Sequence, residues 1–233
     1  MVNKIFYSQI DREQVSIKNL KERTKIFLST NNKLIELNRN LFKNFFKKMN
    51  MKNLVKFFFE LAQLRFIKHV GWNLIGITSK ESVAEHSLRA AQIAYVLALL
   101  ENYENPEEIA MLVLFHDLHE CRSGDIHKVA NRYVDKERIA LEQTKNLGKI
   151  GNKIFEIWKK AHSREKAAII AKDADLLEQA ITAKEYLEQG FKYAQDWINN
   201  VEKSLVTDSA KRLLKVVKKI NPNEWWQELK KIK

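Results

Sequence analysis

Apolar residues recur every three or four positions along most of this chain, which is the spacing of an amphipathic helix. From residue 51 onward the pattern predicts a helix that ends near Gly71, a helix after Ser82, and a helix that starts at Pro106 and stops by Gly124. Further helices are predicted at 136–163, 164–190, 209–220 and after Pro222. With 6 glycines and 2 prolines in 233 residues, the chain lacks the turns of a β-sandwich or barrel, so we expect an all-α fold.

Local signals mark several helix ends. Ser82 and Glu85 have the spacing of a capping box, in which each side chain bonds the backbone N–H of the other. Pro106 suits the first turn of a helix, and Gly190 suits a helix C-terminus. These positions therefore predict where three of the helices begin or end.

Residues 1–50 are predicted to form a basic helical extension of a main domain at 51–233. They hold 11 Lys and Arg against 4 Asp and Glu, a net charge of +7 out of +12 for the whole chain. Two amphipathic stretches in this extension could pack on the main domain or on a partner, which we favour, or lie on a nucleic acid or an anionic membrane surface. The excess charge as a whole is interpreted as a solvated lysine-rich surface, and a contact surface for a polyanion or a membrane is the alternative.

The scarcity of cysteine and of long apolar segments suggests the cellular compartment. Cys121 is the single cysteine, so an internal disulfide or a Cys-based zinc cluster is excluded. The first residues carry acids where a signal peptide needs an apolar run, and no uncharged segment approaches the roughly 18 residues that span a bilayer. We therefore expect a cytoplasmic protein with no transmembrane segment.

Acidic and imidazole side chains interrupt three otherwise apolar helical faces. AMLVLFHDLHE brings His116 and Asp117 to the end of a buried segment, SVAEHSLRAA carries His86, and AAIIAKDADLLEQ carries Asp173 and Asp175. Burying such groups costs several kcal/mol unless a partner compensates. Two imidazoles and two carboxylates suit one divalent transition-metal ion, Mn, Co, Ni, Fe or Zn, with positions left for water and substrate.

One familiar metal motif does not fit this stretch. The zinc-protease helix HExxH requires histidines at i and i+4 with a glutamate after the first. In HDLHE the histidines are at i and i+3, and Asp117 follows the first. We therefore reject a zinc protease.

Taken together, the ordered motifs resemble the HD-domain metal-dependent phosphohydrolases, which share an H…HD…D pattern. The segments that carry the resemblance are GW at 71–72, ESVAEHS at 81–87, HDLHECRSGDI at 116–126 and KDADLLEQAITAKEY at 172–186. This arrangement is most similar to the 5′-deoxynucleotidase branch of that family. The resemblance covers about residues 51–220, implies a helical bundle that acts as a homodimer, and leaves residues 1–50 without a counterpart.

The resemblance also implies roles for individual residues. It assigns the metal to His86, His116, Asp117 and Asp175, acid–base catalysis to Glu120, and a place beside the attacked phosphate to Asp125. Trp72 matches an aromatic residue next to the sugar and base. Bacterial members have an arginine before this tryptophan that contacts the phosphate, and here Gly71 stands in its place. The cations that could replace that arginine are Lys68, Arg65, Arg89 and Lys128, and Lys68 is taken as the provisional substrate contact.

The function expected is removal of the 5′-phosphate from deoxyribonucleoside monophosphates. Two alternatives remain: another HD-type hydrolase that acts on a cyclic nucleotide or a triphosphate, or a basic nucleic-acid-binding protein without catalysis. Among the neighbouring residues, His119 is expected to support the site or face solvent, and His69, His127 and His162 to face solvent. For His69 and His127, which flank the site segments, contact with the substrate is the alternative. Asp173 is expected to pair with Lys172 or Arg164 on the surface, and Cys121 to be a structural thiol.

Overall fold

The computed structural model describes residues 33, 35–36 and 50–230. Residues from Met51 onward form one compact unit, and within the described residues this unit is helical, with a single isolated β-bridge between Lys68 and Ser82. The all-α prediction is confirmed. No described helix is both long enough and apolar enough to cross a membrane. The predicted N-terminal extension falls almost wholly outside the described residues and stays a prediction.

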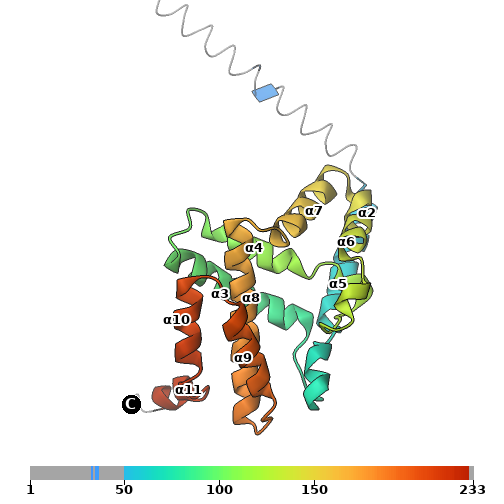
Figure 1. The fold of residues 1–233 in the computed structure, drawn as a ribbon. Helices are drawn as coiled ribbons and strands as arrows, with labels where there is room; N and C mark the ends of the chain where they lie inside the picture. Colours follow the sequence, from blue (N-terminus) through green and yellow to red (C-terminus); the bar gives the residue numbers. More distant parts are fainter. Residues whose placement is uncertain (1–32, 34, 37–49, 231–233) are drawn as a thin grey trace, which may run out of the picture. The chain divides into compact units, whose positions relative to one another are not determined.

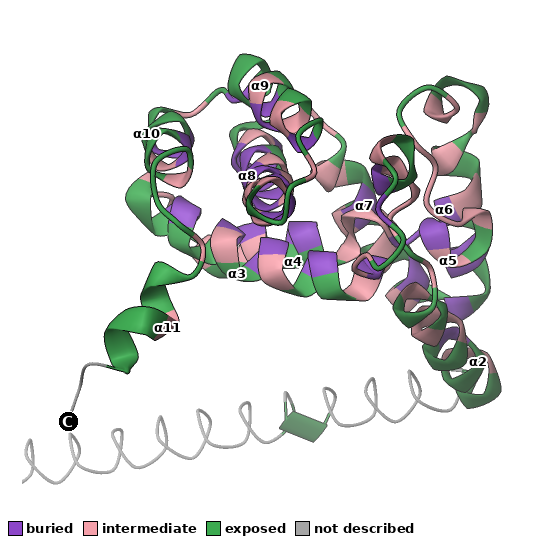
Figure 2. Cartoon of the chain, turned by 90° about the horizontal axis from the view of Figure 1, so that it is seen from below, coloured by how far each residue is buried: buried purple, intermediate pink, exposed green. Residues whose placement is uncertain are grey.

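One long helix, α8 (Lys166–Glu188), lies at the centre of this unit. The helices that pack around it are α3 (Val83–Leu100), α4 (Pro106–His116), α9 (Ala194–Ser204) and α10 (Asp208–Val217) (Figure 1). Buried alanines line the facing sides of α3 and α8, and such small side chains let the two helix backbones approach closely. Figure 2 shows α8 buried on the sides that face α3, α4 and α9. The main hydrophobic core is built on this helix.

A second, smaller core forms beside the first. It is formed by Phe57, Leu118, Ala140, Leu147 and Trp158. Its residues come from α2 (Met51–Leu61), the turn after α4, α6 (Lys136–Thr144), η4 (Lys145–Leu147) and α7 (Lys149–Ala161). The other short elements of this part of the chain are η1 (Ala62–Arg65), α5 (Glu120–Ser123) and η3 (Asn131–Tyr133). The remaining elements are η2 (Val70–Ile75) before α3 and α11 (Glu224–Leu229) near the C-terminus.

The first predicted helix ends ten residues earlier than expected, at Leu61 instead of near Gly71. The chain beyond it forms the short turns η1 and η2, joined by a stretch that pairs with the segment before α3. His69 donates its backbone N–H to Glu81, and Val83 donates its own to Ile67. These non-local hydrogen bonds replace the hydrogen bonds of a continued helix, and the periodicity of the sequence does not predict them.

The predicted helix at 136–163 is also wrong as a single element, because it breaks into α6, η4 and α7. Gly148 has φ 60° and ψ −137°, a backbone conformation that disfavours any side chain. Gly151 lies so close to α6 that an added Cβ would be 1.9 Å from the carbonyl oxygen of Thr144. Two glycines therefore fold this segment back on itself. The helix α9 was not predicted.

The capping signals are confirmed. Ser82 and Glu85 form the complete capping box at the start of α3, and Pro106 is in the first turn of α4. Gly190 follows α8 with φ 98°. The helix α4 stops at His116, however, and not near Gly124, so the HDLHE segment spans a helix end, a turn and the start of α5.

The expectation of a surface ion pair for Asp173 is wrong. Asp173 is 1% exposed and accepts hydrogen bonds from the backbone N–H groups of Val206 and Thr207 at 2.6–3.1 Å, and from the Thr207 hydroxyl at 2.7 Å. Thr207 is the N-cap of α10. A buried carboxylate of α8 thus anchors the turn between α9 and α10 and lies where the α10 dipole favours negative charge.

Replacing Asp173 by asparagine should destabilise the fold. The new amide group cannot accept the N–H donors that the lost oxygen accepts, which leaves buried donors unsatisfied at a cost of about 1–3 kcal/mol. Urea unfolding of Asp173→Asn should show this loss. Asp196→Asn, which changes an exposed carboxylate on α9, should leave the midpoint within the error of the wild-type value. Equal midpoints for both variants would contradict the anchoring role.

Candidate active site

Four side chains from α3, α4 and α8 meet at one point. Nε2 of His86 lies 3.1 Å from Oδ1 of Asp175, and Nε2 of His116 lies 3.0 Å from Oδ2 of Asp117 and 3.8 Å from Oδ1 of Asp175. The capping box sets the start of α3 and so the position of His86 in its first turns. His116 and Asp117 are placed by the end of α4. These are the four residues that the resemblance assigned to the metal.

The other nitrogen of each imidazole has a partner on the side away from this point. Nδ1 of His86 lies 2.5 Å from Oε2 of Glu178, and Nδ1 of His116 lies 2.6 Å from the carbonyl oxygen of Val113. Because these acceptors require an Nδ1–H donor, each neutral ring keeps its Nε2 lone pair for the shared centre. Metal-binding histidines in proteins are oriented by partners of this kind.

The carboxylates give the centre a strong negative charge. Burial opposes the charged form of His116, but Asp117 and Asp175 raise its pKa to about 10. Burial likewise lowers the pKa of His86, yet hydrogen bonds to Asp175 and Glu178 bring it well above its usual value. Without a metal ion, His86 and His116 would therefore both be protonated at neutral pH, and their positive charges would offset those of the carboxylates. A divalent cation bound to two neutral imidazoles would supply the same charge and release both protons.

The donor set fits a divalent transition ion. Donors about 2.1 Å from one ion, at ordinary coordination angles, lie roughly 3.0–3.4 Å from one another. Two of the imidazole–carboxylate separations fall in or at the edge of this range, at 3.0 and 3.1 Å, and another is 3.8 Å. One donor atom from each of His86, His116 and Asp117 falls within 4.8 Å of the others. The nitrogen and oxygen ligands leave the choice among Mn, Co, Ni, Fe and Zn open.

A polar cavity of about 320 Å³ has the four converging residues in its wall, and Glu120 and Asp125 line it as well. Glu120 begins α5 and is not on the helix of His116, contrary to the single helix expected. Its Oε2 is buried and has no hydrogen-bond partner among the described residues. Burial, followed by the charges of Asp117 and Asp125, raises the pKa of Glu120 to about 10. Such a carboxyl group beside a polar cavity is suited to accepting and donating protons.

Asp125 connects two segments that are distant in the sequence. Its Oδ2 accepts the backbone N–H of Val70 at 2.6 Å, which ties the loop after Gly124 to η2. Gly124 enables this loop with φ 71°. Asp125 therefore holds the Gly71–Trp72 pair at the cavity wall.

Trp72 also lines the cavity but is only 2% exposed. Its ring stacks on Trp197 with centroids 5.1 Å apart and meets the edge of Tyr186 at the same separation. Its Nε1 donates to Oε1 of Glu81 at 3.2 Å. Neither face of Trp72 is open to a flat ligand, so it forms a wall and not a stacking platform.

The cations at the cavity are Lys128, Lys136 and Lys172. Of the four cations proposed from the sequence, Lys128 is therefore the one that lines it. Lys68 lies outside the cavity wall and pairs with Glu85 at 3.7 Å. Arg89 is engaged by Glu178 and Glu185, and Arg65 lies beside Phe66. Gly71 is at the wall with nothing within 4 Å of an added Cβ.

The structure gives several residues positions that the sequence analysis did not predict. Glu178 was missed, although it lies one helical turn after Asp175, and that i, i+3 spacing was the available signal. His69 lies in the cavity wall with its ring 4.5 Å from that of His86, and His127 and His162 line the cavity as well. His69 and His127 are therefore half-buried in the wall, whereas His162 lines the cavity and is also exposed, as expected.

His119 and Cys121 lie beneath the site. His119 is fully buried, and the indole N–H of Trp158 donates to its Nδ1 at 3.4 Å. Burial lowers the pKa of His119 to about 4, so the ring is neutral at pH 7. Burial also raises the pKa of Cys121 to about 11, which keeps it in the unreactive thiol form and agrees with a structural role.

A family model described as an HD domain matches residues 61–217, well over half of the chain. The chain belongs to the HD-domain phosphohydrolase family. It is 30% identical over 151 residues to a 5′-deoxynucleotidase of Cronobacter sakazakii, which covers 58% of this chain and 74% of the relative. A 5′-deoxynucleotidase of Dictyostelium discoideum is 31% identical over 153 residues, with coverage of 60% and 80%.

The fold of this HD-domain protein also matches solved structures. A predicted coding region from Archaeoglobus fulgidus is 32% identical, with a TM-score of 0.53 over 75% of this chain and 99% of that one. A protein from Pyrococcus horikoshii is 23% identical, with a TM-score of 0.59 over 70% and 97%. The second likeness concerns the fold alone.

Removing the acceptor behind His86 should weaken metal binding. In Glu178→Gln the charged acceptor of Nδ1–H is lost, and changes to such outer partners typically cost about 10–100-fold in affinity. Titration of the chelator-treated protein with Mn²⁺ by calorimetry measures this loss. Glu188→Gln alters another acid of α8 that does not face the site and should bind as the wild type does. An unchanged affinity in Glu178→Gln would show that His86 does not depend on this acid.

The raised pKa of Glu120 should make the chelator-treated protein less stable as pH rises. Between about pH 4.3, where a free glutamate titrates, and about pH 10, the folded state holds a proton that the unfolded state releases. Unfolding is therefore favoured progressively across this window. Glu120→Gln lacks this penalty and should be more stable than the wild type at pH 8 and about equal to it at pH 4. Urea midpoints that differ equally at both pH values would contradict the assignment.

Proposed function

We propose that this chain is a metal-dependent 5′-deoxynucleotidase, which converts deoxyribonucleoside 5′-monophosphates to deoxynucleosides and phosphate. The observation that carries the proposal is the convergence of His86, His116, Asp117 and Asp175 beside an unpaired buried carboxyl group, Glu120. The curated relatives named above support the choice of substrate.

The four converging residues hold the ion. When bound, a divalent ion at this point lowers the pKa of a water molecule and neutralises charge on a phosphate oxygen. The positive charge of a bound ion would favour the carboxylate form of Glu120, which then takes the proton of the attacking water as the water oxygen forms a bond to phosphorus. The bond between phosphorus and the 5′-oxygen breaks, and Glu120 returns the proton to that leaving oxygen. The raised pKa of Glu120 suits the second step in particular.

The phosphate group is held by the cavity wall. Lys128, Lys136 and Lys172 supply positive charge in place of the arginine that bacterial members carry before the tryptophan. Asp125 orients the attacking water and keeps the Gly71–Trp72 turn in place through the hydrogen bond that it accepts from Val70. Lys68 is not retained as a substrate contact, because it pairs with Glu85 outside the wall.

Three finer features complete the proposal. Nitrogen and carboxylate donors together favour a transition metal such as Mn or Co over Mg or Ca. A homodimer and a cytoplasmic location are proposed from the family resemblance and from the single cysteine. The basic extension at 1–50 is proposed to bind a partner or the main domain.

Phosphate release tests this function. The full-length protein with Mn²⁺ or Co²⁺ should release inorganic phosphate from deoxynucleoside 5′-monophosphates, and Glu120→Gln should lower kcat by at least about 100-fold while it retains the metal. His116→Ala should lose metal and turnover together. Release of phosphate from no 5′-nucleotide with any of several metals would falsify the proposal.

The products separate this function from its relatives. Ring opening of a cyclic nucleotide would identify another HD-type hydrolase. So would cleavage of a nucleoside triphosphate that releases inorganic triphosphate or pyrophosphate. Salt-dependent DNA or RNA binding that persists in His116→Ala, without hydrolysis of any nucleotide, would identify a binding protein.

A further inference from the structure

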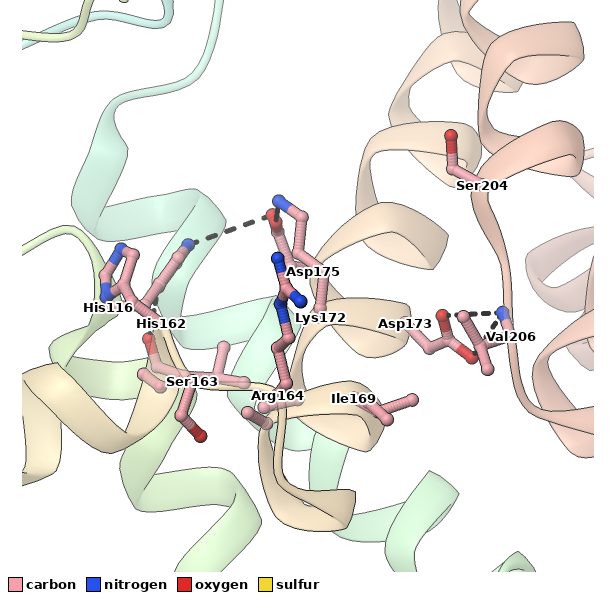
Figure 3. Close-up of a pocket in the computed structure, with 14 residues that line it drawn as sticks. His116, His162, Ser163, Arg164, Ile169, Lys172, Asp173, Asp175, Ser204 and Val206 are labelled. Atoms are coloured by element: carbon pink, nitrogen blue, oxygen red, sulfur yellow. Dashed lines mark hydrogen bonds and ion pairs between the residues drawn. The ribbon is translucent and has the colours of Figure 1, made fainter.

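A second cavity of about 520 Å³ adjoins the metal-binding centre (Figure 3). It lies between the first half of α8, the loop that joins α7 to α8, and the end of α9. It shares four wall residues with the polar cavity described above, namely His116, His162, Lys172 and Asp175. One end of this second cavity is therefore the edge of the catalytic centre.

The walls of the second cavity are mostly apolar. The apolar lining consists of Val113, Ala161, Ala168, Ile169, Ala171 and Val206. Asp173 also contributes to the wall, but both of its oxygens already accept hydrogen bonds from Val206 and Thr207. The carboxylate is therefore directed at the start of α10 and does not demand a polar ligand. A cavity of this size and character is typical of small-molecule sites.

The residues at the boundary between the two cavities are polar and partly cationic. Lys172 holds Oδ2 of Asp175 at 2.5 Å, and the ring of His162 stacks on Trp158 with centroids 4.1 Å apart. Arg164 extends along the second cavity towards the Lys172–Asp175 pair (Figure 3). A guanidinium in this position can cover the face of a flat ring while the apolar wall covers the other. The geometry thus separates a charged compartment from an apolar one.

We propose that the apolar cavity binds the nucleobase of the substrate while the polar cavity holds its phosphate. This inference rests on the proposed function. A deoxynucleotide has a dianionic end and a flat, largely apolar end joined by a sugar, and the two adjoining cavities match that division. The alternative platform, Trp72, offers no open face, because it stacks on Trp197 and is only 2% exposed.

Filling the cavity tests the inference with a pair of substrates that differ by the base alone. Deoxyadenosine 5′-monophosphate and 2-deoxyribose 5-phosphate share the phosphate and the sugar carbon that carries it. Ile169→Trp and Ser204→Trp fill the cavity from opposite walls, on α8 and α9. Each should lower kcat/KM for the nucleotide by about 10–100-fold and leave that for the sugar phosphate unchanged, because only the base needs the cavity.

Lys203→Trp is the matched control, since Lys203 is the exposed neighbour of Ser204 and lines neither cavity. It should behave as the wild type on both substrates, and circular dichroism should show that all three variants fold. Unchanged nucleotide kinetics in both filled variants would overturn the inference while the proposed function stands. An equal loss on both substrates would also overturn it, because the metal centre would then be disturbed. A wild-type protein that hydrolyses neither substrate would remove the proposed function and this inference together.

Discussion

The buried imidazole of His86, held between Asp175 and Glu178, is the interaction on which the rest of the site depends. Its ring is 1% exposed, and both acids belong to α8, on successive turns. A charged group in such a place is tolerated only when every partner is present. The contact therefore requires α3 to start at Ser82 and to pack closely against α8, which the alanines of both helices permit. The same contact directs Nε2 of His86 towards Asp175 and the centre that His116 and Asp117 reach from the end of α4.

The polar residues of α8 lie on different faces of the helix, so this helix contacts several parts of the molecule. Asp173 anchors the start of α10, Asp175 and Lys172 face the two cavities, and Glu178 supports His86 and Arg89. The apolar residues between them complete the main core. Structural stability and the proposed chemistry thus share one element, so that disturbing the packing of α8 also moves the ligands.

Breaks in the helices matter as much as the helices. Because α4 ends at His116, the chain turns at Asp117 and brings Glu120 back towards the centre from the start of α5. Gly124 then lets Asp125 reach the backbone of Val70, which holds η2 against the cavity.

Much of the fold and the site could be predicted from local signals. The apolar periodicity identified α3, α4, α8 and α10, and the Ser82–Glu85 pair identified the start of α3. The polar residues on apolar faces gave the candidates for the centre, and the family resemblance selected the four that converge. The sequence predicts these features because each depends on neighbours within a few positions. The signal for Glu178 was present as well, at one turn from Asp175, and was overlooked.

The rest was decided by contacts between distant segments. The helix at Met51 ends at Leu61 because the following residues bond to the segment before α3, and Asp173 turns inward because Val206 and Thr207 come to meet it. Whether Lys68 or Lys128 lines the cavity, and whether an apolar compartment adjoins the metal centre, also depends on how α7, α8 and α9 pack. The sequence by itself determined the helices and the residue types of the centre, since local hydrogen bonding and burial dictate them. Only the tertiary structure decided which polar groups pair with one another, because those pairings join residues up to about a hundred positions apart.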